Sequence, residues 1–232
     1  MDRLRLAVFD CDGTLVDSQA GIVAAMCEAW RAFGLAEPDR ASVRRIVGLS
    51  VLDAVAHLHP LGTPDLHQAL AERYKTSFRE SRLRGEHVEP LFPGVVEALD
   101  EIGRAGTLLG IATGKSRRGL LATLERHGLL ERFVTLQTAD TGPGKPHPDM
   151  VRRAMAEAGA DAAGTVVIGD TTYDMMRARS AGVAAVGVAW GYHEAADLEA
   201  AGAHAVCRIC HDVPATVTRL LTAVAGSMGN PE

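Results

Sequence analysis

Acidic residues follow a short apolar run near the start of the sequence, in VFDCDGTLVDS at positions 8–18. Asp10 and Asp12 are two residues apart and lead into the turn-forming pair Gly13-Thr14. Two carboxylates 4 Å apart repel each other by about 4 kcal/mol at an effective dielectric near 20, and each raises the pKa of the other unless a cation intervenes. Mg²⁺ would supply that cation, because it prefers carboxylate, water and phosphate oxygens. The pair therefore indicates a metal site.

Three later segments carry side chains suited to the same chemistry. They are TGKS at 113–116, GKPHPD at 144–149 and GDTTYD at 169–174, which contain Thr113, Lys145, Asp170 and Asp174. Each follows or lies near the end of a β-capable run. In an open parallel sheet, ligands bind beyond the carboxyl ends of the strands, so we expect these side chains to meet.

The elements that would position them alternate between strand and helix in the second half of the chain. β-Capable runs are expected at 4–9, 107–113, 133–138, 165–170, 183–189 and 204–209, and helices near 93, 116, 149, 172, 194 and 213. Between about 17 and 88 the patterns are helical throughout, beginning with a helix that Ser18 is expected to cap and that ends at Gly34.

This alternation predicts an α/β fold: a Rossmann-like, three-layer α/β/α core with a mainly parallel sheet. The helical block would be inserted after the first strand as a cap. The expected division is a core of residues 1–16 and 89–232 and a cap of residues 17–88.

The four segments in this order resemble those of the haloacid dehalogenase superfamily: D-x-D-G-T, a Thr-bearing second loop, a Lys, and then G-D-x-x-x-D. The helical block, with LFPGVVEALDEI and GKPHPDM, is similar to the branch that contains phosphoglycolate phosphatases and β-phosphoglucomutases. The resemblance covers nearly the whole chain. It implies a Mg²⁺-dependent phosphatase acting on a small phosphate monoester, such as phosphoglycolate or a sugar phosphate.

The resemblance also implies roles for individual residues. Asp10 would attack phosphorus to give an aspartyl-phosphate, and Asp12 would protonate the leaving group and then activate water. Thr113 would bind the phosphoryl oxygens, and Lys145 would offset the repulsion between phosphate and Asp10. The expected phosphate-binding residues are Cys11, Gly13, Thr14, Gly114 and Lys115, and the expected metal ligands are Asp10, Asp12, Asp170 and Asp174. For Asp174, contact through water or orientation of Lys145 is the favoured role.

Composition excludes several other classes of protein. The 232 residues have a net charge of −5, 4% aromatic residues and no long basic run, which argues against nucleic-acid binding. No apolar stretch is long enough to cross a membrane, so a cytoplasmic protein is expected. The expected partner is a small phosphorylated metabolite, and the expected oligomeric state is a monomer or a homodimer. Cysteines at 11, 27, 207 and 210 are expected to be reduced, and CRICH at 207–211 is not expected to bind haem or zinc.

Several alternatives stay open. A phosphomutase would share Asp10, Asp12 and Lys145. A pyrophosphatase is a further alternative, and a phosphonate hydrolase would need a cap lysine, for which only Lys75 is available. Outside enzymes, a receiver-like phosphoprotein would also have a phosphorylated Asp and bind Mg²⁺. The side chains with undecided roles are Asp17, Arg44, Arg45, Gly48, Trp190 and Tyr192.

Overall fold

A computed structural model describes residues 3–86 and 88–227 of the chain. Its six-stranded sheet has the order β3-β2-β1-β4-β5-β6, and every pairing is parallel. The strands are β1 (Arg5–Phe9), β2 (Thr107–Thr113), β3 (Thr135–Thr138), β4 (Thr165–Gly169), β5 (Ala184–Val188) and β6 (Ala205–Cys207). The order reverses between β1 and β4, so a ligand site is expected beyond their carboxyl ends.

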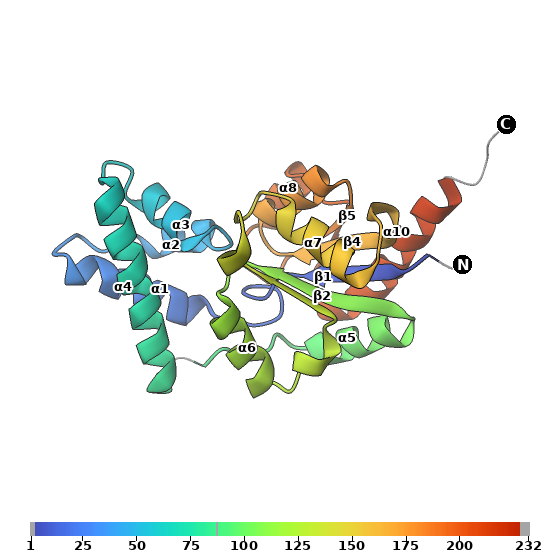
Figure 1. Ribbon diagram of the computed structural model, residues 1–232, viewed down its shortest axis with the longest axis horizontal. Helices are drawn as coiled ribbons and strands as arrows, with labels where there is room; N and C mark the ends of the chain where they lie inside the picture. Colours follow the sequence, from blue (N-terminus) through green and yellow to red (C-terminus); the bar gives the residue numbers. More distant parts are fainter. Residues whose placement is uncertain (1–2, 87, 228–232) are drawn as a thin grey trace.

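Helices cover both faces of this sheet (Figure 1). One face packs on α5 (Val95–Arg104), α6 (Arg117–Arg126) and α10 (Val213–Ser227), and the other on α7 (Asp149–Ala158), α8 (Thr172–Ala181) and α9 (Ala195–Ala200). Alternate residues of β1 point to opposite faces: Ala7 and Phe9 join the first core, Leu6 and Val8 the second. The predicted three-layer α/β/α architecture is confirmed.

Four helices between β1 and β2 form a separate body beside the sheet (Figure 1). They are α1 (Gln19–Ala32), α2 (Arg40–Ile46), α3 (Val51–Leu58) and α4 (Pro64–Leu83). Their apolar faces enclose a core of their own, in which Met26 and Trp30 of α1 are buried with Val55 of α3 and Leu70 of α4. The predicted helical insert is therefore present, and we call these four helices the cap.

The two segments that join the cap to the sheet lie side by side. Val16 and Leu91 form an antiparallel bridge, and the N–H of Asp17 donates to the carbonyl of Pro90 at 2.8 Å. Both connections therefore leave the core at one place.

The expectation that Ser18 caps the N-terminus of α1 is wrong in one respect. Ser18 stands at the N-cap of α1, but its side chain makes no capping hydrogen bond. The Ser18 hydroxyl instead donates to Asp12 Oδ1 at 2.6 Å. The sequence pattern that marks the start of a helix cannot predict this partner, because the hydrogen bond depends on how the chain folds after β1.

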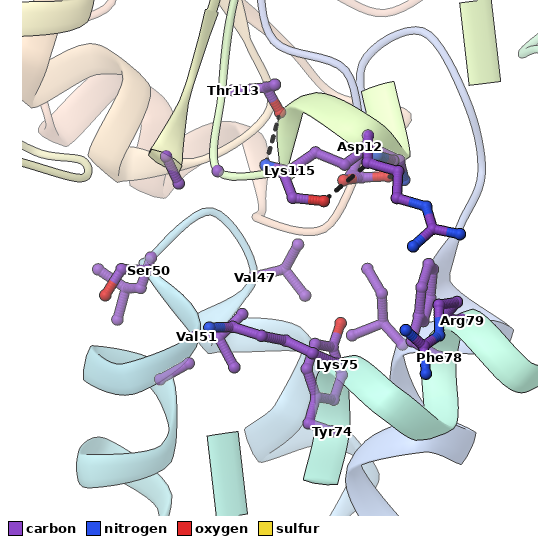
Figure 2. Close-up of a pocket in the computed structure, with 18 of the residues that line it drawn as sticks. Asp12, Val47, Ser50, Val51, Tyr74, Lys75, Phe78, Arg79, Thr113 and Lys115 are labelled. Carbon is purple, nitrogen blue, oxygen red and sulfur yellow. Dashed lines mark hydrogen bonds and ion pairs between the residues drawn. The ribbon is translucent and has the colours of Figure 1, made fainter. Parts of the chain in front are cut away.

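A cavity of about 670 Å³ lies between the cap and the carboxyl ends of the strands (Figure 2). It is lined by Asp10, Asp12 and Thr113 from the core, and by residues of the 47–52 segment and α4 from the cap. Within the described residues, no helix is long and apolar enough to span a bilayer.

Candidate active site

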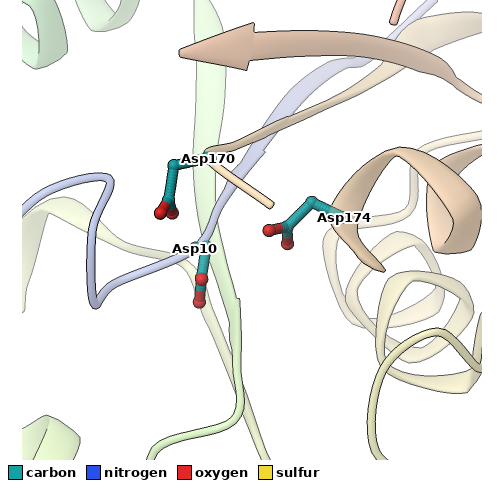
Figure 3. A group of neighbouring side chains, drawn as sticks. All are labelled: Asp10, Asp170 and Asp174. Atoms are coloured by element: carbon teal, nitrogen blue, oxygen red, sulfur yellow. The ribbon is translucent and has the colours of Figure 1, made fainter. Parts of the chain in front are cut away.

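Three carboxylates converge beyond the carboxyl ends of β1 and β4 (Figure 3). Asp10 follows β1, Asp170 follows β4, and Asp174 lies in the first turn of α8. All three side chains are buried, and one oxygen from each lies within 4.8 Å of the others. This group can hold a metal ion, and no other set of three converging His, Cys, Asp or Glu side chains occurs in the described part of the chain.

The charges in this group are not balanced by the protein alone. Burial, followed by the neighbouring charges of Asp10 and Asp174, raises the pKa of Asp170 well above its ordinary value. Burial also raises the pKa of Asp10, although Lys145 opposes this effect. Asp10 Oδ1 is buried and has no hydrogen-bond partner among the described residues. Hard oxygen ligands, crowded and partly unsatisfied, fit a divalent cation such as Mg²⁺.

Lys145 and Arg177 provide the positive charge that is present. Lys145 Nζ lies 2.5 Å from Asp10 Oδ2 and 2.9 Å from Asp174 Oδ1. Arg177, which is fully buried on α8, lies 2.7 Å from the same Asp174 oxygen. Burial opposes ionisation of Asp174, but these two cations outweigh it and lower its pKa. Asp174 thus contacts Lys145 directly, and its role, either contact with a metal through water or orientation of this lysine, stays a prediction.

Asp12 is not a member of the group of three carboxylates and has partners of its own. Its Oδ1 accepts hydrogen bonds from Ser18 Oγ at 2.6 Å and from Lys115 Nζ at 2.7 Å. Burial raises the pKa of Asp12, but the charge and hydrogen bond of Lys115 and the hydrogen bond of Ser18 outweigh burial and lower it overall. Asp10 and Asp12 thus have pKa values shifted in opposite directions, which suits two carboxylates with different tasks.

Lys115 holds a second buried acid besides Asp12. Its Nζ donates to Glu89 Oε1 at 2.9 Å, and Thr123 Oγ1 donates to Glu89 Oε2 at 2.9 Å. Despite the cost of burial, Asp12 and Glu89 help to raise the pKa of Lys115, which is therefore firmly cationic. Its contacts are with these carboxylates, and phosphate binding by Lys115 stays a prediction.

The turn after β1 is built against Asp170. Gly13 has φ +85°, and a Cβ at this position would lie 2.2 Å from Asp170 Oδ2, so only glycine fits. Thr14 Oγ1 donates to Asp170 Oδ1 at 2.8 Å, and the N–H of Tyr192 donates to Oδ2 at 3.0 Å. These contacts fix the orientation of Asp170.

The second loop meets the cap directly. The Thr113 hydroxyl accepts a hydrogen bond from the N–H of Lys115 at 3.2 Å. A Cβ added at Gly114 would lie 3.1 Å from the carbonyl oxygen of Gly48 and 3.2 Å from that of Leu49. The Gly48-Leu49 segment, which we call the cap loop, therefore lies close to the predicted phosphate site. The thiol of Cys11 is buried in the core, so any phosphate contact by Cys11 would come from its backbone N–H.

The structure also places the residues whose roles were undecided. The carbonyl of Arg45 accepts hydrogen bonds from Tyr173 at 3.4 Å and from His193 at 3.1 Å, which ties α2 to the core. The Trp190 indole donates to the carbonyl of Thr14 at 3.1 Å, and the Tyr192 hydroxyl lies 3.1 Å from Ser18 Oγ. Both aromatic residues support the loops. Asp17 accepts a hydrogen bond from the N–H of Gln19. Gly48 and Lys75 line the cavity, whereas Arg44 does not.

Sequence reasoning missed three functional candidates: Ser18, Glu89 and Arg177. Glu89 lies in the return connection from the cap, a place where an acid has no secondary-structure signal. Arg177 could have been found, because it follows Asp174 by three residues on a predicted helix and would share its face. Its complete burial depends on the packing of α8 against the sheet.

Comparison with known proteins agrees with this arrangement. The family model for haloacid dehalogenase-like hydrolase matches residues 7–188. The protein named Probable phosphatase IndB of Dickeya dadantii is 41% identical over 198 residues, which are 84% of this chain and 86% of that protein. The phosphoglycolate phosphatase of Agrobacterium fabrum is 32% identical over 199 residues, 84% of each chain.

Solved structures share the fold. A hydrolase from Pseudomonas syringae superposes with a TM-score of 0.79 at 27% identity, covering 93% of this chain and 98% of that chain. A haloacid dehalogenase-like family hydrolase from Streptococcus pneumoniae gives a TM-score of 0.81 at 24% identity, covering 92% and 98%.

Proposed function

Because the chain belongs to the haloacid dehalogenase-like hydrolases, we propose that it is a Mg²⁺-dependent phosphatase acting on a small organic phosphate monoester through an aspartyl-phosphate. The observation that carries this proposal is the convergence of Asp10, Asp170 and Asp174 with the Lys145 ammonium, 2.5 Å from Asp10. The names of the relatives, a phosphatase and a phosphoglycolate phosphatase, support the same reaction.

Asp10 is the proposed nucleophile. One of its carboxylate oxygens forms a bond to phosphorus while the bond from phosphorus to the alcohol oxygen breaks. Its second oxygen, Oδ2, stays paired with Lys145, which neutralises the negative charge that the incoming phosphate brings. Water then attacks phosphorus, the bond from phosphorus to Asp10 breaks, and phosphate leaves.

Asp12 is the proposed acid and base. It gives its proton to the departing alcohol oxygen and then takes one from the attacking water. In the substrate-free protein Lys115 favours the ionised form of Asp12, which is the form needed for the second step. The negative charge of a bound phosphate would oppose Lys115 and favour the protonated form needed for the first step.

Thr113 and the N–H of Gly114 are the proposed ligands of the remaining phosphoryl oxygens, together with the backbone of the turn at 11–14. Asp10, Asp170 and Asp174, with the backbone carbonyl of Asp12, would hold the metal. When bound, Mg²⁺ supplies positive charge that stabilises the phosphoryl group during transfer.

We further propose that the cap spans residues 17–88 and moves on the paired connections at Val16 and Leu91. The close approach of Gly48 and Leu49 to Gly114 supports a closed arrangement, in which the cap would keep bulk water from the site. Opening would admit the substrate.

The test is phosphate release from p-nitrophenyl phosphate with and without Mg²⁺. Wild-type protein should turn over the ester only with the metal, and Asp10→Asn should lose at least about a thousandfold in kcat. Asp197→Asn makes the same change on the exposed surface of α9 and should leave kcat unchanged. Undiminished turnover by Asp10→Asn would contradict the proposal.

A further inference from the structure

The cavity beside Asp12 is large for the smallest substrates of this reaction class. Its volume of about 670 Å³ lies within the range of about 300–1,000 Å³ that suits ligands the size of a drug or a cofactor. A phosphate ester of a two-carbon acid would leave most of this space unfilled. The alcohol part of the substrate is therefore expected to be considerably bulkier.

The position of Asp12 gives the direction in which the alcohol part extends. Asp12 must reach the oxygen that leaves phosphorus, so the alcohol lies on its side of the site. Lys115 Nζ is 2.7 Å from Asp12 and 5.4 Å from the centre of the Phe78 ring. Phe78, from α4 of the cap, therefore lies within reach of a group attached to the leaving oxygen.

Phe78 belongs to an aromatic surface. Tyr74 precedes it by one helical turn on α4, and the two rings are stacked with their centres 5.9 Å apart at 28°. Both line the cavity, both are partly exposed, and Figure 2 shows them on the cap side, across the cavity from Asp12 and Lys115. Apolar side chains continue this wall, among them Met26, Val47 and Val51. An apolar wall that contains two partly exposed aromatic side chains favours a planar ring, which can pack against their faces or edges.

Arginine side chains also line this cavity. Arg79 of the cap and Arg118 of α6 both line it, both are exposed, and neither has a hydrogen-bond or ion-pair partner among the described residues. Guanidinium groups donate several hydrogen bonds and no group on them accepts. They suit a ring that carries carbonyl, ring-nitrogen or other acceptor groups.

We infer that the physiological substrate is the phosphate monoester of a ring-bearing alcohol of nucleoside size, whose planar ring packs on Tyr74 and Phe78 and whose polar edge faces Arg79 and Arg118. This inference rests on the proposed phosphatase function and specifies its substrate. On this inference, the substrate specificity of the chain differs from that of an enzyme specific for phosphoglycolate.

The experiment compares kcat/KM for adenosine 5′-monophosphate, p-nitrophenyl phosphate, phosphoglycolate and glycerol 3-phosphate in wild-type, Phe78→Leu and Phe33→Leu proteins. Phe33 is 43% exposed, lies at the end of α1 and does not line the cavity, so it is a matched control within the cap. Phe78→Leu should raise KM about fivefold for the two ring-bearing esters and leave the ringless esters within about twofold. Phe33→Leu should change neither.

A higher kcat/KM for phosphoglycolate or glycerol 3-phosphate than for both ring-bearing esters in the wild-type protein would overturn the inference. An equal effect of Phe78→Leu on all four esters would do the same, because it would indicate general damage to the cap. Absence of turnover for every ester would instead contradict the phosphatase function, and the inference with it.

Discussion

Lys115 pairs with two acids from distant parts of the chain, one partly buried and one fully buried. Asp12 comes from the loop after β1, and Glu89 from the connection that returns from the cap. A single ammonium group therefore links the proposed acid–base residue to the cap connection. Removing one partner of a buried ion pair leaves the other charge uncompensated, which costs far more than losing a surface pair.

Lys115→Met should therefore lower the free energy of unfolding by about 3–5 kcal/mol, because it removes the cation 2.7 Å from Asp12 and leaves Glu89 with only the more distant Arg82, 4.0 Å away. Chemical denaturation measures this change. Lys75→Met removes the exposed pair of Lys75 with Glu72 on α4 and should cost under about 1 kcal/mol. A loss in Lys115→Met no larger than that in Lys75→Met would show that the Lys115 pairs add no more stability than an exposed pair.

Arg177 is a buried cation in a group that is expected to bind another cation. Its guanidinium meets Asp174, and its positive charge also lowers the pKa of Asp10, although burial is the largest influence on that pKa. Nε and Nη1 of Arg177 have no hydrogen-bond partner among the described residues. The arginine thus reduces the negative charge available to a metal ion and is itself incompletely satisfied.

Arg177→Met should bind Mg²⁺ about tenfold more tightly than the wild-type protein, because a positive charge near the site repels the metal. Isothermal titration calorimetry gives the dissociation constants directly. Arg179→Met removes the same charge from the exposed side of α8 and should leave the affinity unchanged. Equal or weaker Mg²⁺ binding by Arg177→Met would contradict this account of the site.

At the scale of elements, the strand ends bring carboxylates together and burial raises the pKa of two of them. Asp10 and Asp170 retain protons above the pH at which they would ionise in the unfolded chain. As pH rises from the unfolded value of 3.8 through their folded pKa values, ionisation without a cation destabilises the fold. A metal ion removes that penalty.

The increase in Tm caused by MgCl₂ should therefore be larger at about pH 8 than at about pH 5, because protons compete with the metal for carboxyls whose pKa values are raised. Differential scanning fluorimetry with and without MgCl₂ measures it. Asp170→Asn should show little increase at either pH. A metal-induced increase that is independent of pH would contradict the assignment of the raised pKa values.

The approach of the cap loop to the loop after β2 gives a second test at this scale. Gly114→Ala adds a Cβ facing the carbonyl oxygens of Gly48 and Leu49 at 3.1–3.2 Å, so the cap loop must shift. We expect kcat/KM to fall about tenfold or more, since displacement of a catalytic arrangement is costly, with little change in Tm.

Gly103→Ala on α5 provides the control for this variant, because a Cβ there meets nothing within 4 Å. It should leave kcat/KM unchanged. If Gly114→Ala keeps full activity, the cap loop does not need its close approach for catalysis.

At the scale of the whole molecule, the strands and the side chains at their ends could be predicted, because short-range sequence patterns determine them. Mostly apolar runs that end at Asp10, Thr113 and Asp170 predicted three of the strands. Parallel pairing then required the side chains at these strand ends to share one edge of the sheet. The convergence of Asp10, Asp170 and Asp174 follows from this topology.

What could not be predicted depends on tertiary packing. The pairing of Lys115 with Asp12 and Glu89 requires the cap connection to pass beside α6, which no local pattern encodes. The cavity between cap and core likewise depends on how α4 faces the strand ends, so the ring-binding surface of Tyr74 and Phe78 was invisible in the sequence.

The central claim is that Asp10 carries the phosphoryl group during turnover. Wild-type protein mixed with substrate and Mg²⁺, quenched rapidly and reduced with borohydride, should contain homoserine at position 10, which peptide mass spectrometry detects. Asp10 is converted in this way only where its carboxylate has become an acyl phosphate. Homoserine at another aspartate, or none at any position while phosphate is being released, would contradict the account.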